Sequence, residues 1–294
     1  MTPMIKVFIQ KKLFILLGMA LLFSADHLVA QNKLKQAKKL YETQQYEAAR
    51  ALLEPMRAER ENDTAVQSLL GSTYARLELW EQAADQVEGL VEAYPGNAEY
   101  QFRYGGALGL EAKNSNRFTA LMMLDDVKYH LKKATQLDNN HINSRWALVQ
   151  LYVELPTVIG GTKANAMKYA KQLANISPVD GALAKGFIER SLENYQKAEA
   201  YLQQAVDMGQ SATTYTRLAE LYEEMKRKSK ALQTLEKGIA QTDDFNLKIK
   251  LAKLAKKYQS KTRKALGYLK MLDKEKLTKV QKAKVKDCIQ LLKR

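Results

Sequence analysis

Residues 69–97, LLGSTYARLELWEQAADQVEGLVEAYPGN, read as two helices with a glycine inside the first one. A glycine in a helix interior costs roughly 0.5–1 kcal/mol relative to alanine, so a compensating contact is expected at Gly71. Twelve residues later Ala83 has another small side chain, Val87 follows at helical spacing, and Pro95 ends the pattern. The stretch therefore predicts two antiparallel helices whose backbones approach closely where Gly71 faces Ala83.

The twelve-residue spacing of small side chains recurs along the chain. In residues 217–244, RLAELYEEMKRKSKALQTLEKGIAQTDD, Ala219 and Ala231 take the places of the two small residues. Less complete copies are found in residues 37–56, 186–209 and 251–272. Repetition at one spacing indicates a repeat architecture, in which each unit buries its apolar face against its neighbours.

The pattern resembles the tetratricopeptide repeat, a family built from 34-residue pairs of antiparallel helices. The resemblance implies an all-α fold, a right-handed superhelical solenoid of antiparallel helix pairs. About seven repeats are expected over residues 31–276, followed by a basic capping helix over 277–294. Insertions are expected to interrupt two repeats, near 112–125, where the spacing is about ten residues too long, and near 156–163, where PTVIGGTK adds about four. In the second insertion Thr162 can cap the next helix.

The N-terminal segment has the features of an export signal. Lysines precede an apolar run from Leu13 to Phe23 of about 11 residues, and a small residue follows at Ala30. Spanning a bilayer takes roughly 20 residues, so the run is short for a transmembrane helix. We expect residues 1–30 to be a cleaved signal peptide, with cleavage after Ala30 or, as an alternative, after Ala25. An uncleaved membrane anchor remains an alternative. The mature chain is expected to have no transmembrane span and to be exported, periplasmic or secreted.

The net charge of +15 is concentrated at one end of the chain. From Lys226 to Arg294 there are 22 Lys and Arg residues against 6 Asp and Glu, whereas the rest of the chain has 25 against 26. A basic surface attracts polyanions. An anionic envelope component is therefore a possible partner, nucleic acid is not expected in an exported protein, and a solvated lysine-rich face remains the alternative reading.

No catalytic, cofactor or metal site is predicted. His130 and His141 are not part of an HExxH motif or a Cys/His cluster, so a zinc site is unsupported. GGTK at 160–163 lacks the glycine spacing and the following Ser or Thr of a phosphate-binding loop. Asp125 and Asp126 are adjacent in sequence, which makes them a poor acid/base couple and favours a role in a turn or helix cap. The chain is therefore not expected to be an enzyme.

The family resemblance places a binding groove along the first helix of each repeat and assigns it fixed positions. Transferred onto this chain, the candidate groove residues are Tyr41, Arg76, Phe102, Phe187, Arg190, Glu220, Glu223, Glu224, Lys250 and Lys257. The leading prediction is an exported, non-enzymatic scaffold that binds another protein or a peptide in this groove. The alternatives are a small-molecule-binding partner of a membrane transporter, suggested by the proline and double-glycine connection, and a binder of anionic envelope polymers.

Overall fold

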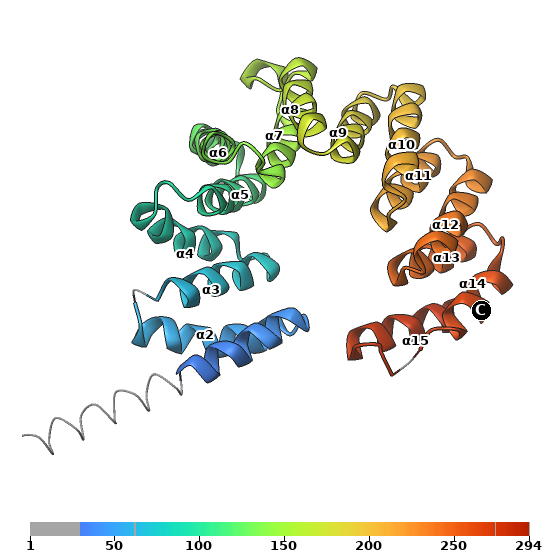
Figure 1. The fold of residues 1–294 in the computed structure, drawn as a ribbon, viewed down its shortest axis with the longest axis horizontal. Helices are drawn as coiled ribbons and strands as arrows, with labels where there is room; N and C mark the ends of the chain where they lie inside the picture. The colour runs from blue at the N-terminus through green and yellow to red at the C-terminus, as the bar shows by residue number, and fades with distance from the viewer. Residues whose placement is uncertain (1–29, 62, 274, 294) are drawn as a thin grey trace, which may run out of the picture. The chain divides into compact units, whose positions relative to one another are not determined.

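The computed structural model describes residues 30–61, 63–273 and 275–293. The predicted signal peptide lies outside these residues except for Ala30. The chain divides into two compact units, one up to Leu137 and one from Asp138. Figure 1 shows the helices of both units with their labels.

The first unit is a series of helices in which each packs against the next. Residues 30–42 are helical. The following helices are α2 (Tyr46–Glu59), α3 (Thr64–Arg76), α4 (Trp80–Ala93), α5 (Ala98–Asn114) and α6 (Arg117–Leu137). Short connections join consecutive helices, so neighbours in sequence are neighbours in space, as in a helical repeat.

The second unit is built in the same way. Its elements are α7 (Ile142–Glu154), the 3₁₀ turn η1 (Thr157–Ile159), α8 (Lys163–Ile176), α9 (Pro178–Ser191), α10 (Tyr195–Gly209), α11 (Ala212–Glu224), α12 (Lys228–Thr242), α13 (Phe245–Lys257), α14 (Thr262–Lys270) and α15 (Lys279–Lys293). Consecutive helices pack together, and α15 covers α13 and α14 through Val285 and Cys288, which are buried.

The described residues therefore form seven consecutive helix pairs and a last helix, without strands. This confirms the predicted all-α, repeat-type fold. We call the first helix of each pair the A helix and the second the B helix. The predicted domain limits at residues 31, 276 and 277 stay predictions.

Small residues lie where an A helix approaches its B helix, although the expected contact at Gly71 is displaced by one turn. A Cβ placed on Gly71 would lie 3.1 Å from Val87 Cγ2 and 3.3 Å from Gln86 Cβ, so these residues rather than Ala83 face it most closely. A Cβ on Gly186 would lie 2.7 Å from Leu202 Cγ. The contacts of Gly71 with Val87 and of Gly186 with Leu202 join residues 16 apart in sequence, one helical turn beyond the predicted spacing of 12.

The first insertion lengthens helices instead of forming a loop. A Cβ on Gly105 would lie 3.2 Å from Leu131 Cγ, a contact between residues 26 apart and therefore ten more than in the other repeats. The extra residues extend α5 to Asn114 and start α6 at Arg117, so α6 is 21 residues long. Asp125 and Asp126 consequently lie inside α6, and the expectation of a turn or cap at this pair is wrong.

The second insertion is a compact connection between α7 and α8. Gly160 has φ 99°, in the left-handed region that favours glycine, and ends the 3₁₀ turn. A Cβ on Gly161 would lie 1.6 Å from the carbonyl oxygen of Leu155, so a larger residue has no room there. The Thr162 side chain accepts a hydrogen bond from the backbone N–H of Asn165, and the predicted cap of α8 is confirmed.

Candidate functional site

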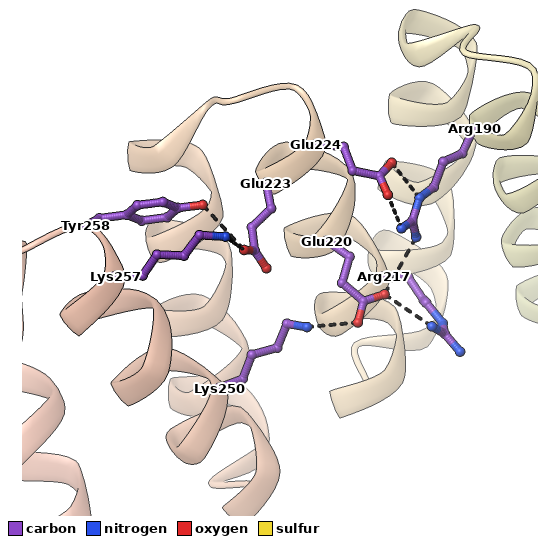
Figure 2. A network of polar contacts seen from close by, with 8 residues as sticks. All are labelled: Arg190, Arg217, Glu220, Glu223, Glu224, Lys250, Lys257 and Tyr258. Atoms are coloured by element: carbon purple, nitrogen blue, oxygen red, sulfur yellow. Dashed lines mark hydrogen bonds and ion pairs between the residues drawn. The ribbon is translucent and has the colours of Figure 1, made fainter. Parts of the chain in front are cut away.

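Seven of the ten candidate groove residues come from three successive A helices of the second unit. Phe187 and Arg190 lie on α9, and Lys250 and Lys257 lie on α13. Between these helices, α11 carries the three candidate glutamates, Glu220, Glu223 and Glu224. Because the A helices are side by side, residues at equivalent repeat positions point toward one another, and Figure 2 shows the charged members of the set meeting across the helices.

The charged candidates form a ladder of ion pairs. Arg190 donates two hydrogen bonds to the Glu224 carboxylate, one of them from Nε to Oε2 at 2.7 Å, and its Nη1 lies 3.6 Å from Glu220 Oε2. Glu220 also accepts a hydrogen bond from Lys250 Nζ at 2.8 Å and one from Arg217 Nη1 at 3.1 Å. The arrangement in Figure 2 thus surrounds the Glu220 carboxylate with three cations.

The ladder continues toward the C-terminal ends of α11 and α13. Lys257 Nζ donates to Glu223 Oε1 at 3.0 Å, and the Tyr258 hydroxyl donates to the same oxygen at 3.4 Å. We call the eight residues of Figure 2 the polar ladder; they are Arg190, Arg217, Glu220, Glu223, Glu224, Lys250, Lys257 and Tyr258. The acids predicted in the sixth repeat are therefore neutralised by bases from the fifth and seventh repeats.

Within the ladder, electrostatics favour the ionised forms of Glu220 and Arg190. Burial by itself would raise the pKa of Glu220, but the hydrogen bond from Lys250 and the charges of Lys250 and Arg217 outweigh it, and the net pKa is lowered. The hydrogen bond to Glu224 raises the pKa of Arg190 further above its ordinary value. The Glu220 carboxylate and the Arg190 guanidinium accordingly stay charged at neutral pH and hold fixed charges along the A helices.

The 34-residue period is visible directly in the side-chain contacts. Arg190 and Glu224 are 34 residues apart, and so are Glu223 and Lys257. A third pair at this separation is formed by Trp146 Nε1, which donates to Asp180 Oδ1 at 2.8 Å. Each pair joins equivalent positions on neighbouring A helices, so one repeat length explains all three contacts.

Next to the ladder lies a partly open hollow of about 780 Å³. Its apolar lining includes Trp146, Phe187 and Tyr195, which are half-buried, and its rim carries Arg217 and Glu224. We call it the aromatic hollow; its residues are Trp146, Gln150, Asp180, Leu183, Phe187, Arg190, Ser191, Glu193, Tyr195, Leu202, Thr213, Arg217, Glu220 and Glu224. Aromatic side chains beside fixed charges are the composition of a surface that anchors a partner.

Sequence reasoning missed several residues of this site. Trp146 and Asp180 were not among the candidates, although their separation of 34 residues is a signal that could have paired them. Arg217 and Tyr258 also join the ladder without having been predicted. Tyr195 starts α10, a B helix, and lies outside the positions that the groove rule samples.

The other three candidates lie in the first unit. Arg76 Nε donates to the Tyr41 hydroxyl at 3.3 Å, so this unit brings two of them together. Phe102 lies half-buried on α5. The role of all ten candidates in binding stays a prediction.

Three further features bear on function, namely metal-ligating clusters, membrane-spanning helices and a reactive cysteine. Residues 30–61, 63–273 and 275–293 include no group of three or more His, Cys, Asp and Glu side chains placed to hold a metal ion. Within the same ranges, each helix is too short or too polar to cross a bilayer. Cys288 is a free, buried thiol, and burial raises its pKa, so it is a poor nucleophile.

Comparison with known proteins finds a family match over part of the second unit. A search among curated proteins finds no match. The tetratricopeptide repeat family model matches residues 190–254, which run from Arg190 in the polar ladder to the interior of α13.

Two solved structures are similar to this chain to different degrees. A tetratricopeptide repeat protein from Parabacteroides merdae is 14% identical, with a TM-score of 0.51 and coverage of 90% of this chain and 99% of that one. A thermophilic tetratricopeptide repeat protein from Thermus thermophilus is 22% identical, with a TM-score of 0.43 and coverage of 76% and 98%. Residues 190–254 are thus similar in sequence to the tetratricopeptide repeat family, and the Parabacteroides merdae structure shows that the chain has the fold of such repeats.

Proposed function

We propose that this protein is an exported, non-enzymatic scaffold that binds an extended segment of another protein along the A helices of its second unit. Tetratricopeptide repeats serve in general as protein-interaction scaffolds. The observation that carries the proposal is the aromatic hollow, because it combines half-buried rings with charges held in place by the polar ladder.

The hollow offers a preorganised surface. The Trp146 ring is held by its hydrogen bond to Asp180, and Asp180 also accepts a hydrogen bond from the Ser177 hydroxyl at 2.6 Å. A ring that is already fixed loses little conformational entropy when a partner packs on it. Arg217 is exposed and keeps donors available beyond its contact with Glu220. An apolar side chain in the hollow and an acceptor near Arg217 are therefore the expected contacts of the ligand.

Site-specific photo-crosslinking tests this proposal. A photoreactive amino acid at Thr213, which is exposed and lines the hollow, should capture the partner in cells, whereas one at the exposed Met271 should not. Phe187→Ala should reduce the capture at Thr213 at least about fivefold, because it removes an aromatic anchor worth about 1 kcal/mol or more. Identical products at Thr213 and Met271, or capture that is unchanged by Phe187→Ala, would contradict binding in the hollow.

Export is part of the proposal and has its own test. The support is the basic, then apolar, then small-residue pattern over residues 1–30. N-terminal sequencing of the protein from the cells that produce it should begin at Gln31. A protein from those cells that still begins at Met1 would count against cleavage.

A second candidate function is binding to an anionic envelope polymer. On α15 the lysines Lys279, Lys282, Lys286 and Lys293 follow one another at intervals of three, four and seven residues, which places them on one flank of the helix. Among the described residues no carboxylate is paired with them, whereas lysines such as Lys250 and Lys257 are used within the fold. Retention of the protein on an acidic polysaccharide should fall steeply as the salt concentration rises, and the double variant Lys282→Glu/Lys286→Glu should abolish the retention. Retention that neither salt nor this variant changes would refute binding through the α15 lysines.

The small-molecule alternative also stays a prediction. It required a pocket closed by the segments near 112–125 and 156–163. These segments belong to different compact units, and each is helical or tightly turned within its own unit.

A further inference from the structure

The outer face of α6 carries an apolar stripe that belongs neither to the core nor to the aromatic hollow. Phe118, Leu121, Met122 and Tyr129 are 73%, 52%, 69% and 58% exposed. Their spacing of three, one and seven residues places them along one side of the helix. Large apolar side chains gathered in this way on a surface mark an interaction site.

The stripe is separate from the face of α6 that builds the fold. Leu124, Val127, Leu131 and Ala134 are buried on the side of the helix that packs against α5. Three of the four exposed residues lie in the ten-residue extension that distinguishes this repeat from the others. Figure 1 shows α6 packed on α5 as the last helix of its unit. The extension therefore adds apolar surface without adding to the core.

The two halves of this outer face differ in shape and charge. The first half carries the protruding Phe118 and Met122 and ends with Asp125 and Asp126. The second half is a shallow hollow of about 290 Å³ around Tyr129. The hollow is lined by Asp125, Lys128, Tyr129, Lys132, Lys133 and Gln136.

We infer that α6 pairs antiparallel with α6 of a second copy of this chain. An antiparallel pair centred near Val127 puts residues whose numbers lie equally before and after it opposite each other. Phe118 of each copy then faces Gln136 of the other, Met122 faces Lys132, and Asp125 faces Tyr129. The protruding half of each helix meets the hollow half of its partner, which is the self-complementarity that a two-fold interface requires.

The side-chain chemistry fits this register. The aliphatic stems of Lys132 and Lys133 can cover Phe118 and Met122 while their ammonium groups stay in water. The Tyr129 hydroxyl can donate to Asp125, whose ion pair with Lys128 at 3.6 Å lies within its own helix and leaves the carboxylate facing solvent. Acids in the first half and lysines in the second attract each other only when the helices run antiparallel.

A lipid surface is the competing occupant of the stripe. It would accept the apolar residues but would repel the carboxylates of Asp125 and Asp126, which lie in the same half of the helix. A second copy instead brings the Tyr129 hydroxyl opposite Asp125 and Lys128 opposite Asp126, so it is the better occupant.

Sedimentation velocity of the purified protein from about 1 to about 100 µM tests the inference, because one helix pair is a small interface with micromolar affinity at best. The mass should rise from monomer toward dimer over this range. Phe118→Glu/Met122→Glu should weaken the association at least about tenfold. Val158→Glu is the matched control, because Val158 is 93% exposed and lies outside α6; it should leave the association unchanged. Circular dichroism melts establish that the variants are folded.

A disulfide test reads out the register independently. In a Cys288→Ser background, a mixture of Asp125→Cys and Tyr129→Cys chains should form a mixed linked dimer faster than either chain alone. The inference is overturned by a protein that stays monomeric at about 100 µM. It is also overturned by association that Phe118→Glu/Met122→Glu does not weaken, or by a stripe that binds anionic vesicles while the protein remains monomeric. None of these outcomes depends on the aromatic hollow of the second unit.

Discussion

Two neighbouring glycines on α5 give a direct measure of why small residues recur in this fold. A Cβ on Gly105 would lie 3.0 Å from His130 Cβ, 3.1 Å from the backbone nitrogen of Leu131 and 3.2 Å from Leu131 Cγ, whereas a Cβ on Gly106 would meet nothing within 4 Å. Both alanine substitutions gain the same helix propensity, about 0.5–1 kcal/mol. Only Gly105→Ala must push α6 away, at a cost of about 1–3 kcal/mol for overpacking.

Gly106→Ala should therefore stabilise the protein by about 0.5–1 kcal/mol, and Gly105→Ala should be neutral or destabilising by up to about 2 kcal/mol. The difference in unfolding free energy between the two variants is then about 1–3 kcal/mol, with the propensity contribution cancelled. Urea unfolding followed by circular dichroism at about 222 nm measures it, and an m-value of about 2 kcal/mol/M converts it into a midpoint difference of about 0.5–1.5 M. If Gly105→Ala is as stable as Gly106→Ala, close helix approach does not explain the small residues, and the reasoning from Gly71 onward fails.

Three further predictions test other contacts. The pKa of Glu220 in the folded protein lies below its ordinary value of about 4.5. The stabilisation from its ion pairs should therefore be complete above about pH 4.5 and should be lost as the pH falls through the folded pKa. Urea titrations between about pH 3 and 6 should show that Glu220→Gln flattens this acid dependence of the unfolding free energy. Burial and, next in size, the hydrogen bond to Glu199 raise the pKa of Tyr222 to about 12, so the stabilisation by this hydrogen bond should be lost as the pH rises from about 10 through 12. An ultraviolet titration of Tyr222→Phe should show one fewer phenol that ionises at high pH. An unchanged number of such phenols would contradict the contact. Thr162→Ala should cost about 0.5–2 kcal/mol through loss of the α8 cap while Thr162→Ser retains most of it, and equal thermal stability of the two would refute the capping role.

Much of the fold could be predicted because its signals are local. Helical periodicity, small residues at a constant spacing and breakers such as Pro95 define each helix pair within about 34 residues, and a chain of such pairs can only bury its apolar faces by stacking in order. The prediction was weaker where tertiary contacts decide. Close approach at Gly71 involves Val87 and Gln86 because the helix pair crosses one turn beyond the spacing of twelve. The extra residues near 112–125 form helix because α5 continues to offer a packing surface for Leu124 and Val127.

The candidate site shows the same division. The family resemblance predicts Arg190, Glu220 and Lys250 as groove residues. The residue types of the ten candidates, however, indicate only a groove that mixes aromatic, acidic and basic side chains. Their pairing across α9, α11 and α13 depends on how neighbouring A helices are spaced, which no single repeat encodes. Trp146 is not among the predicted groove residues, because its role depends on a hydrogen bond to a residue 34 positions later.

By itself, then, the amino-acid sequence determined that this chain forms paired helices at a constant period, because propensity, capping and apolar spacing act within one or two turns. Only the tertiary structure decided which small residue touches which neighbour, which charges neutralise one another, and which apolar face stays uncovered on α6. Those outcomes depend on distances between helices, and such distances are set by the packing of many side chains at once.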